Sequence, residues 1–128
     1  MKILLDTNAY SDWRRSGDWN EAISTADEVL LPVIVLGELL FGFIGSSRKQ
    51  ENEDRLWRFL KEPTVKVPVV DETASRQYSL LKEQLRRQGT PIPENDLWIS
   101  AILIGQGAIL ATSDAHFDHL PQLPRVSK

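Results

Sequence analysis

The chain opens with the stretch Met1-Lys2-Ile3-Leu4-Leu5-Asp6-Thr7-Asn8. The unbroken apolar run from Ile3 to Leu5 is typical of a short strand that is buried on both faces of a sheet. A carboxylate follows this run, and then two residues whose short polar side chains cap helices. The stretch therefore predicts that Asp6 lies at the carboxyl end of a central strand, where ligands bind in open α/β sheets. Taken alone, Asp6 is explained equally well as the cap of the next helix.

Strands and helices alternate along the rest of the chain. Helices are predicted over residues 9–15, 20–26, 33–44, 48–61, 72–88 and 97–105, and strands over 28–31, 65–67 and 108–111. This alternation predicts an α/β fold with a mostly parallel sheet of four to five strands, flanked by helices. Residues 1–128 are expected to form a single domain, with the tail, 120–128, as a candidate edge strand. Thr7 or Asn8 is expected to cap the first helix.

The helix predicted over residues 33–44 is apolar on all sides except at Glu38, so we expect it to be mostly buried. Gly37 and Gly42 lower its helix propensity, and a closely packed neighbouring backbone would explain them. Residues 29–47 are long enough to cross a bilayer and carry one charge. Because Pro32 and three glycines divide this segment, we expect a strand and a helix there, and no membrane contact.

Composition limits the classes of protein to consider. With 41% hydrophobic and 26% charged residues, the sequence is typical of a globular protein, and without cysteine it has no disulfide or thiolate metal site. No export segment is recognised, so a cytoplasmic location is expected by default. The net charge of −3 argues weakly against general nucleic-acid binding. If four acids are committed to a metal ion, however, the other fourteen face fifteen bases, which is compatible with RNA held locally by arginines.

Four acidic residues stand apart from the other fourteen because of their apolar surroundings. Asp6 ends the first strand, Glu38 interrupts an apolar helix, and Asp96 and Asp114 flank the uncharged run 97–113. Acids are rarely buried unless they are paired or bind a metal ion, and no lysine or arginine lies close to them in these segments. The carboxyl ends of parallel strands share one edge of a sheet, so Asp6 and Asp114 are expected to meet there. Asp96 reaches this edge if the linker before it crosses over, and Glu38 does so if its helix leans toward the edge.

A cluster of four carboxylates requires a cation, because like charges raise one another's pKa. An all-oxygen ligand set suits Mg²⁺ or Mn²⁺, which activate water and stabilise charge on a phosphodiester. The alternative is a set of unrelated helix caps and surface acids.

Four short motifs occur in order along the chain: Asp6-Thr7-Asn8, Gly37-Glu38-Leu39, Asn95-Asp96-Leu97-Trp98-Ile99 and Thr112-Ser113-Asp114-Ala115-His116-Phe117. In this order and in their predicted structural contexts, they resemble those of PIN-domain nucleases, and most closely those of the VapC-type ribonuclease toxins of bacterial toxin–antitoxin pairs. Each motif is weak alone, but the four together cover essentially the whole chain.

This resemblance implies that Asp6, Glu38, Asp96 and Asp114 bind Mg²⁺ or Mn²⁺ and that a metal-activated water cleaves RNA. It also implies a homodimer and a small antitoxin protein that covers the site. Thr112 matches the family's threonine near the first aspartate and is interpreted as a hydrogen-bond donor that orients it. Asn8 matches a position that commonly lies behind the metal ligands.

The sequence argues against two other classes of enzyme and leaves further alternatives open. A haloacid-dehalogenase-type phosphatase needs a second acid at the position of Asn8, and a P-loop enzyme needs the motif Gly-x-x-x-x-Gly-Lys, which is missing. An RNA-processing nuclease of the same fold, or a binding module that has lost catalysis, would fit the same four motifs. His116 and His119 have a zinc-like spacing without further suitable ligands. Asp118, four residues after Asp114, is interpreted as a surface acid, with an accessory acid near the metal ion as the alternative, and whether Asp118 or His116 assists stays open.

Overall fold

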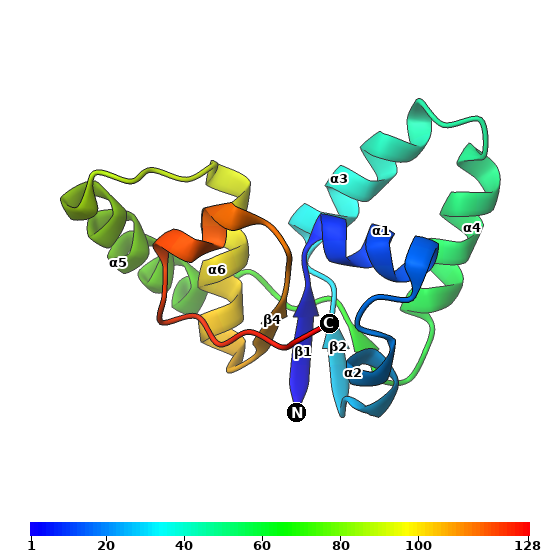
Figure 1. Ribbon diagram of the computed structural model, residues 1–128, viewed down its shortest axis with the longest axis horizontal. Helices are drawn as coiled ribbons and strands as arrows, with labels where there is room; N and C mark the ends of the chain where they lie inside the picture. The colour runs from blue at the N-terminus through cyan, green and yellow to red at the C-terminus, as the bar shows by residue number, and fades with distance from the viewer.

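Four parallel strands form the central sheet of the computed structural model, which describes residues 1–128 (Figure 1). The strands are β1 (Lys2–Leu5), β2 (Glu28–Leu30), β3 (Val65–Lys66) and β4 (Ile109–Ala111), in the spatial order β3-β2-β1-β4. The central position of β1 explains its apolar run, because Ile3, Leu4 and Leu5 are all fully buried. The predicted parallel α/β architecture is confirmed.

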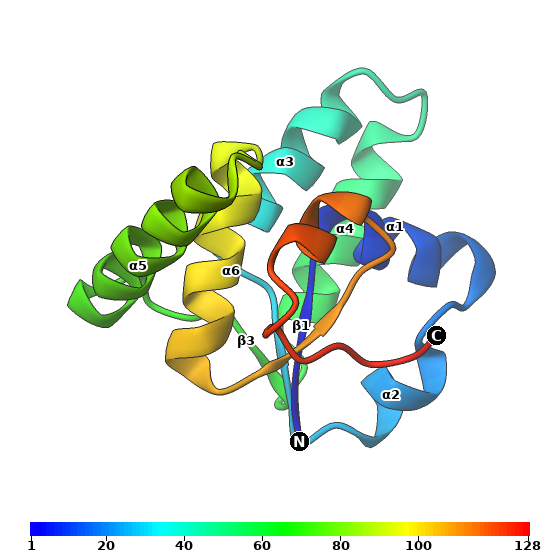
Figure 2. The same ribbon diagram turned by 60° about the vertical axis from the view of Figure 1, so that its left-hand side comes forward.

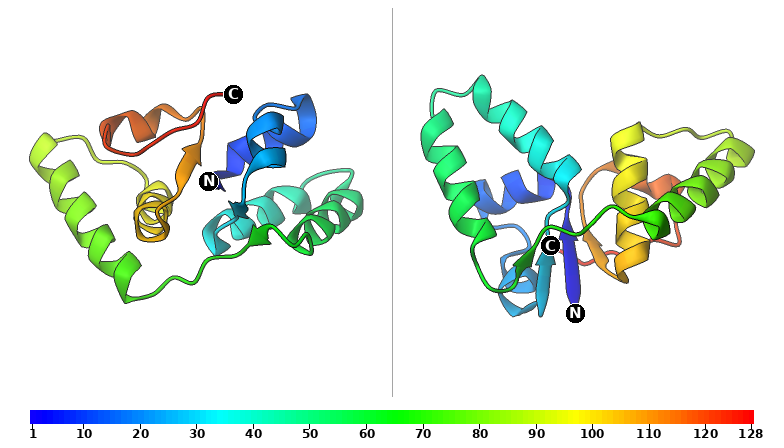
Figure 3. Two further views of the ribbon diagram at one scale, coloured as in Figure 1. Left: turned by 90° about the horizontal axis from the view of Figure 1, so that it is seen from below. Right: turned by 180° about the vertical axis from the view of Figure 1, so that it is seen from behind.

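Helices cover the sheet in two groups. They are α1 (Thr7–Ser16), α2 (Asn20–Thr25), α3 (Val33–Ile44), α4 (Lys49–Leu60), α5 (Glu72–Gln88), α6 (Glu94–Gln106) and a short 3₁₀ helix, η1 (Ala115–His119). Seen from the front and from behind, the α3–α4 pair and the α5–α6 pair stand on opposite sides of β1 and β2 (Figure 1 and Figure 3). No helix is long and apolar enough to cross a membrane.

The prediction that α3 is mostly buried is wrong. Only Val35 and Leu39 of this helix are buried, whereas Phe41 is 77% and Ile44 is 65% exposed. The close backbone neighbour predicted from the glycines is also missing, because a Cβ added at Gly37 or Gly42 would meet nothing within 4 Å. The apolar outer face of α3 is therefore left uncovered in the isolated chain.

The C-terminal tail is held against the sheet by a few specific contacts. The expected edge strand is reduced to a single parallel bridge between Leu110 and Arg125. The buried Trp19 indole donates a hydrogen bond to the Val126 carbonyl at 3.2 Å, so the helix before β2 and the end of the chain are connected. Trp19 itself has a left-handed backbone conformation, which this burial holds in place.

Helix α5 positions the first turn of α6. The rings of Tyr78 and Trp98 stack with centroids 4.2 Å apart. Glu94, at the start of α6, accepts a hydrogen bond from the Tyr78 hydroxyl at 2.6 Å and forms an ion pair with Lys82 at 2.9 Å. These contacts bring the N-terminus of α6 to the edge of the sheet at which β1 ends. Figure 2 shows the first turns of α1 and α6, together with η1, around that end of β1.

Candidate active site

Asp6 is the most buried acid of the chain, with a relative exposure of 4%. Its Oδ1 accepts a hydrogen bond from the Ala9 amide at 2.7 Å, so Asp6 itself caps α1. The prediction that Thr7 or Asn8 supplies this cap is wrong, because the helix begins earlier than expected, at Thr7. One carboxylate therefore ends the strand and caps the helix, so the two interpretations of Asp6 are compatible.

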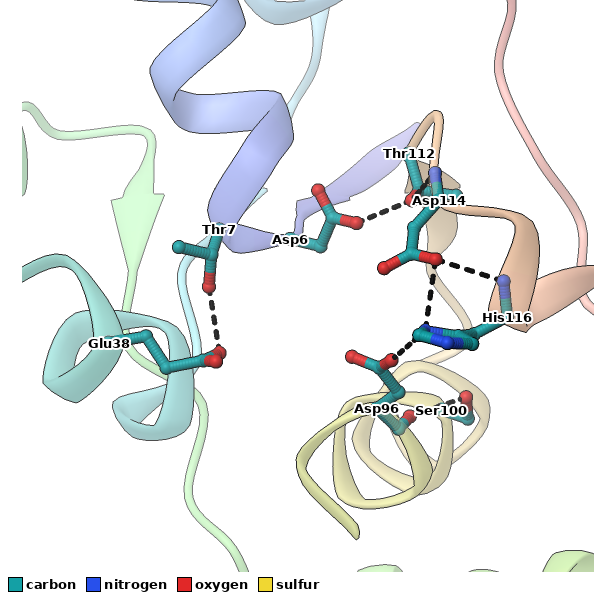
Figure 4. Close-up of polar contacts among 8 residues, drawn as sticks. All are labelled: Asp6, Thr7, Glu38, Asp96, Ser100, Thr112, Asp114 and His116. Carbon is teal, nitrogen blue, oxygen red and sulfur yellow. Dashed lines mark hydrogen bonds and ion pairs between the residues drawn. The ribbon is translucent and has the colours of Figure 1, made fainter. Parts of the chain in front are cut away.

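Strand register places Thr112 beside Asp6. Leu5 pairs with Ala111, so the next residue of each strand leaves the sheet at the same level. The Thr112 hydroxyl donates a hydrogen bond to Asp6 Oδ2 and accepts one from the Asp114 amide at 3.0 Å. The hydrogen bond predicted between Thr112 and Asp6 is present, and the same hydroxyl fixes the turn that carries Asp114 (Figure 4).

Asp96 and Asp114 meet across His116. The His116 Nδ1 lies 3.1 Å from a carboxylate oxygen of each aspartate, and oxygens of both with a nitrogen of this ring lie within 4.8 Å of one another. A single ring nitrogen carries one proton at most, so His116 donates to one carboxylate at a time. Asp96 sits on a regular first turn of α6, where the Ser100 hydroxyl donates to its backbone carbonyl at 2.8 Å.

Glu38 faces the other three acids from α3. Its Oε1 accepts a hydrogen bond from the Thr7 hydroxyl at 2.8 Å, which draws the side chain toward the start of α1. In Figure 4 Glu38 lies across from Asp96 and Asp114, and the carboxylate of Asp6 is directed to Thr112. The ligand atoms that lie within 4.8 Å of one another come from Asp96, Asp114 and His116, so Asp6 and Glu38 flank this tighter group. The lean of α3, which sequence reasoning left open, therefore brings Glu38 to the predicted edge.

The electrostatics of this cluster favour a bound cation. Burial, followed by the charges of Asp114 and Asp96, raises the pKa of Asp6 to about 6, although the hydrogen bonds from Thr112 and Ala9 act in the opposite direction. Burial and Asp114 also raise the pKa of Asp96. No lysine or arginine forms an ion pair with any of the four acids; the ion-pair partner of Asp96 and Asp114 is His116. Hard oxygen ligands without a basic partner fit a divalent cation such as Mg²⁺ or Mn²⁺.

Sequence reasoning misses two residues of this site and leaves a third without a visible role. Thr7 is predicted only as a helix cap, yet it contacts Glu38. His116 belongs to the fourth motif, but the sequence leaves its role open; its position two residues after Asp114 places it in the same tight turn. Asn8 is exposed and its side chain forms no hydrogen bond, so its predicted supporting role stays a prediction. Asp118 faces away, forming an ion pair with Arg125 at 2.9 Å.

A parallel sheet with Asp6 and Asp114 after β1 and β4, and with Glu38 of α3 and Asp96 of α6 facing the same edge, defines a PIN-type domain, and comparisons with known proteins agree. The PIN domain family model matches residues 3–123. The ribonuclease VapC1 of Haemophilus influenzae is 31% identical over 119 residues, covering 88% of this chain and 86% of its own. The ribonuclease VapC2 of Rickettsia felis is 29% identical over 131 residues, covering 96% and 95%.

Solved structures give the same result. The VapBC-1 structure from nontypeable H. influenzae superposes with a TM-score of 0.85 at 25% identity, covering 99% of this chain and 98% of that one. The R. felis VapBC2 structure, bound to a DNA fragment from its promoter, has a TM-score of 0.82 at 26% identity and 98% coverage of both chains. The chain belongs to the PIN domain family, and within it to the VapC-type ribonucleases of toxin–antitoxin systems. The family predicted from the four motifs is confirmed.

Proposed function

We propose that this chain hydrolyses RNA phosphodiester bonds with Mg²⁺ or Mn²⁺ held by Asp6, Glu38, Asp96 and Asp114. The observation that supports this most is that four carboxylates face the same edge of the sheet and that none of them has a lysine or arginine partner. Two of them follow strands β1 and β4, one begins α6 and one lies on α3. Bound at this site, the ion supplies an activated water and offsets negative charge on the phosphate.

The surrounding residues hold the carboxylates in place. Asp6 is nearly inaccessible, and both of its oxygens accept hydrogen bonds from the chain. Its role would therefore be to hold the ion and not to contact RNA. Thr7 gives Glu38 a fixed position on the opposite side. His116, with a side chain that is 51% exposed, is the one group of the cluster that reaches solvent easily while touching Asp96 and Asp114.

Cleavage of a labelled single-stranded RNA tests this proposal. Activity should require added Mg²⁺ or Mn²⁺, disappear in excess EDTA and be nearly abolished by Asp96→Asn. The matched control is Asp118→Asn, which removes one acid of the neighbouring turn that faces Arg125 instead of the cluster. Unchanged cleavage in EDTA or in Asp96→Asn would refute the metal mechanism.

We further propose that the chain acts as the toxin of a pair, assembles as a homodimer and is inhibited by a small antitoxin protein that covers the site. The uncovered apolar face of α3, with Phe41 and Ile44 exposed on the helix that carries Glu38, supports the presence of a protein partner. Expression of this chain alone should arrest growth, and coexpression of the short protein encoded by a neighbouring reading frame should relieve the arrest. Normal growth with active, soluble protein would favour an RNA-processing role.

A further inference from the structure

A basic pocket lies between α1 and the α3–α4 pair. Its volume is about 330 Å³, and its lining includes Arg14, Arg15, Arg48 and Arg55 but no carboxylate. Four guanidinium groups around one pocket are notable in a chain whose net charge is −3. Such a concentration of positive charge attracts a polyanion locally, whatever the sign of the whole molecule.

This pocket adjoins a second cavity that reaches Glu38 of the candidate active site. A neighbouring cavity of about 300 Å³ is lined by Thr7 and Glu38 at one end and shares Ser11, Phe43 and Asn52 with the basic pocket. Arg14 is seven positions after Thr7 on α1, which corresponds to about 10 Å along the helix axis. Arg14 therefore lies on the path of a strand that extends along α1 from the acids.

The basic surface continues beyond the pocket. A second pocket, of about 540 Å³, shares Arg14 and Arg55 with the first and adds Arg58. Its lining also includes Glu62, the only carboxylate in either basic pocket. The three cavities therefore form one track, which changes from acidic at Glu38 to basic at the arginines.

Aromatic rings hold Arg14 in position. Its guanidinium carbon lies 4.0 Å from the ring centroid of Trp13 and 5.2 Å from that of Phe59. Its Nε donates to the Tyr10 hydroxyl at 3.3 Å, while its two terminal nitrogens donate to no group of the chain. An arginine stacked in this way loses little conformational freedom when it binds a phosphate.

The charges of the pocket are only partly neutralised within the chain. Arg15 forms an ion pair with Asp12, and Arg48 forms one with Glu51 at 3.5 Å, in which both side chains are more than 70% exposed. Exposed pairs of this kind are weak and are easily exchanged for another anion. Arg14 and Arg55 have no acidic partner, so the pocket retains free positive charge.

We propose that this arginine pocket binds phosphates of the RNA strand flanking the cleaved bond, and so positions the substrate on the four acids. This inference rests on the proposed ribonuclease function. An RNA strand is favoured over an acidic peptide because the track leads directly to Glu38, and because a strand cut at the acids must continue along the surface on either side. A positively charged groove that follows the phosphate backbone is a usual means of holding single strands.

The test measures binding of a fluorescent single-stranded RNA to the Asp96→Asn protein in Mg²⁺, at several salt concentrations. The double variant Arg48→Gln/Arg55→Gln, whose two exposed side chains do not pack in the core, should bind about tenfold more weakly at low salt. The slope of log K against log salt should fall by about 1.4, or about 0.7 for each single-strand phosphate contact that is lost. Arg48→Lys/Arg55→Lys should restore most of that slope, because lysine keeps the charge.

The matched control is Arg76→Gln/Arg87→Gln, which removes the same charge from α5. Equal losses in the two double variants would overturn the inference, since the effect would then come from net charge alone. Unchanged RNA binding together with lost binding of polyglutamate would also overturn it and assign the pocket to an acidic protein. The proposed function is tested separately. If the native chain cleaves RNA and the arginine variants bind RNA as tightly as the parent protein does, the ribonuclease function stands and only the inference about the pocket fails.

Discussion

Replacement of Asp6 by asparagine in the metal-free protein should reveal how much the buried, ionised Asp6 carboxylate lowers the free energy of unfolding. In the folded chain the pKa of Asp6 is raised from 3.8 to about 6, mainly because the carboxylate is buried. A rise of this size corresponds to about 3 kcal/mol at about 1.4 kcal/mol for each pH unit. The group is almost fully buried, so solvent screens little of this energy.

The direction in which folding stability changes with pH follows from proton linkage. Below about pH 3 Asp6 is mostly protonated in both the folded and the unfolded chain, so little penalty applies. As the pH rises from the unfolded pKa of 3.8 to the folded pKa of about 6, the unfolded chain ionises before the folded one, and the folded state loses stability. An asparagine at this position does not ionise, so the free energy of unfolding of Asp6→Asn minus that of the native chain should increase by about 3 kcal/mol between pH 3 and pH 7.5 and stay level above that.

Urea unfolding in excess EDTA, followed by tryptophan fluorescence at several pH values, measures this difference. Asp71 is the matched control, because it caps α5 by accepting from the Ala74 amide at 3.2 Å and is exposed. Asp71→Asn should change stability by less than about 1 kcal/mol at every pH, since asparagine caps as well as aspartate. A difference for Asp6→Asn that stays flat with pH, or falls as pH rises, would refute the reasoning.

Further predictions concern metal, the supporting hydroxyls and the exposed face of α3. Mg²⁺ at about a hundred times its Kd should stabilise the native chain by about 2.7 kcal/mol, measured by thermal unfolding, and should stabilise Asp6→Asn much less. Thr112→Val should lower metal affinity or cleavage about 10- to 100-fold, whereas Thr112→Ser, which keeps the hydroxyl, should retain most of both. Thr7→Val should reduce cleavage over a similar range by releasing Glu38; full activity would remove Thr7 from the site. Phe41→Ser should change unfolding free energy by less than about 0.5 kcal/mol yet weaken self-association in sedimentation; unaltered association would place the dimer contact elsewhere.

Local pattern was sufficient to predict the elements that form the site. The apolar runs of β1 and β4 and the alternation of strands and helices identified a parallel sheet, and parallel strands place Asp6 and Asp114 at one edge. The four acids were recognisable because each interrupts or borders an apolar segment. Charge in such a segment requires a reason, since burying an unpaired carboxylate is costly.

Other features depended on contacts between segments distant in sequence. Glu38 and Thr7 are 31 residues apart and meet only because α3 packs beside α1. His116 joins Asp96, 20 residues earlier, because α5 anchors the first turn of α6 at the sheet edge. The exposure of α3 does not follow from its sequence. An apolar helix face indicates that other residues will pack against it, but not whether those residues belong to the same chain or to another one.

Residue type and order along the chain identify the groups that carry the chemistry: a strand that ends in Asp6, three further acids in apolar surroundings and a motif order shared with PIN domains. These are local properties, set by residue type and spacing along the chain. The packing of distant segments establishes that Asp6 both caps α1 and joins the cluster, that Thr7 holds Glu38, and that an arginine pocket lies next to it. Those relations depend on strand register and helix packing, which bring together side chains that no local pattern connects.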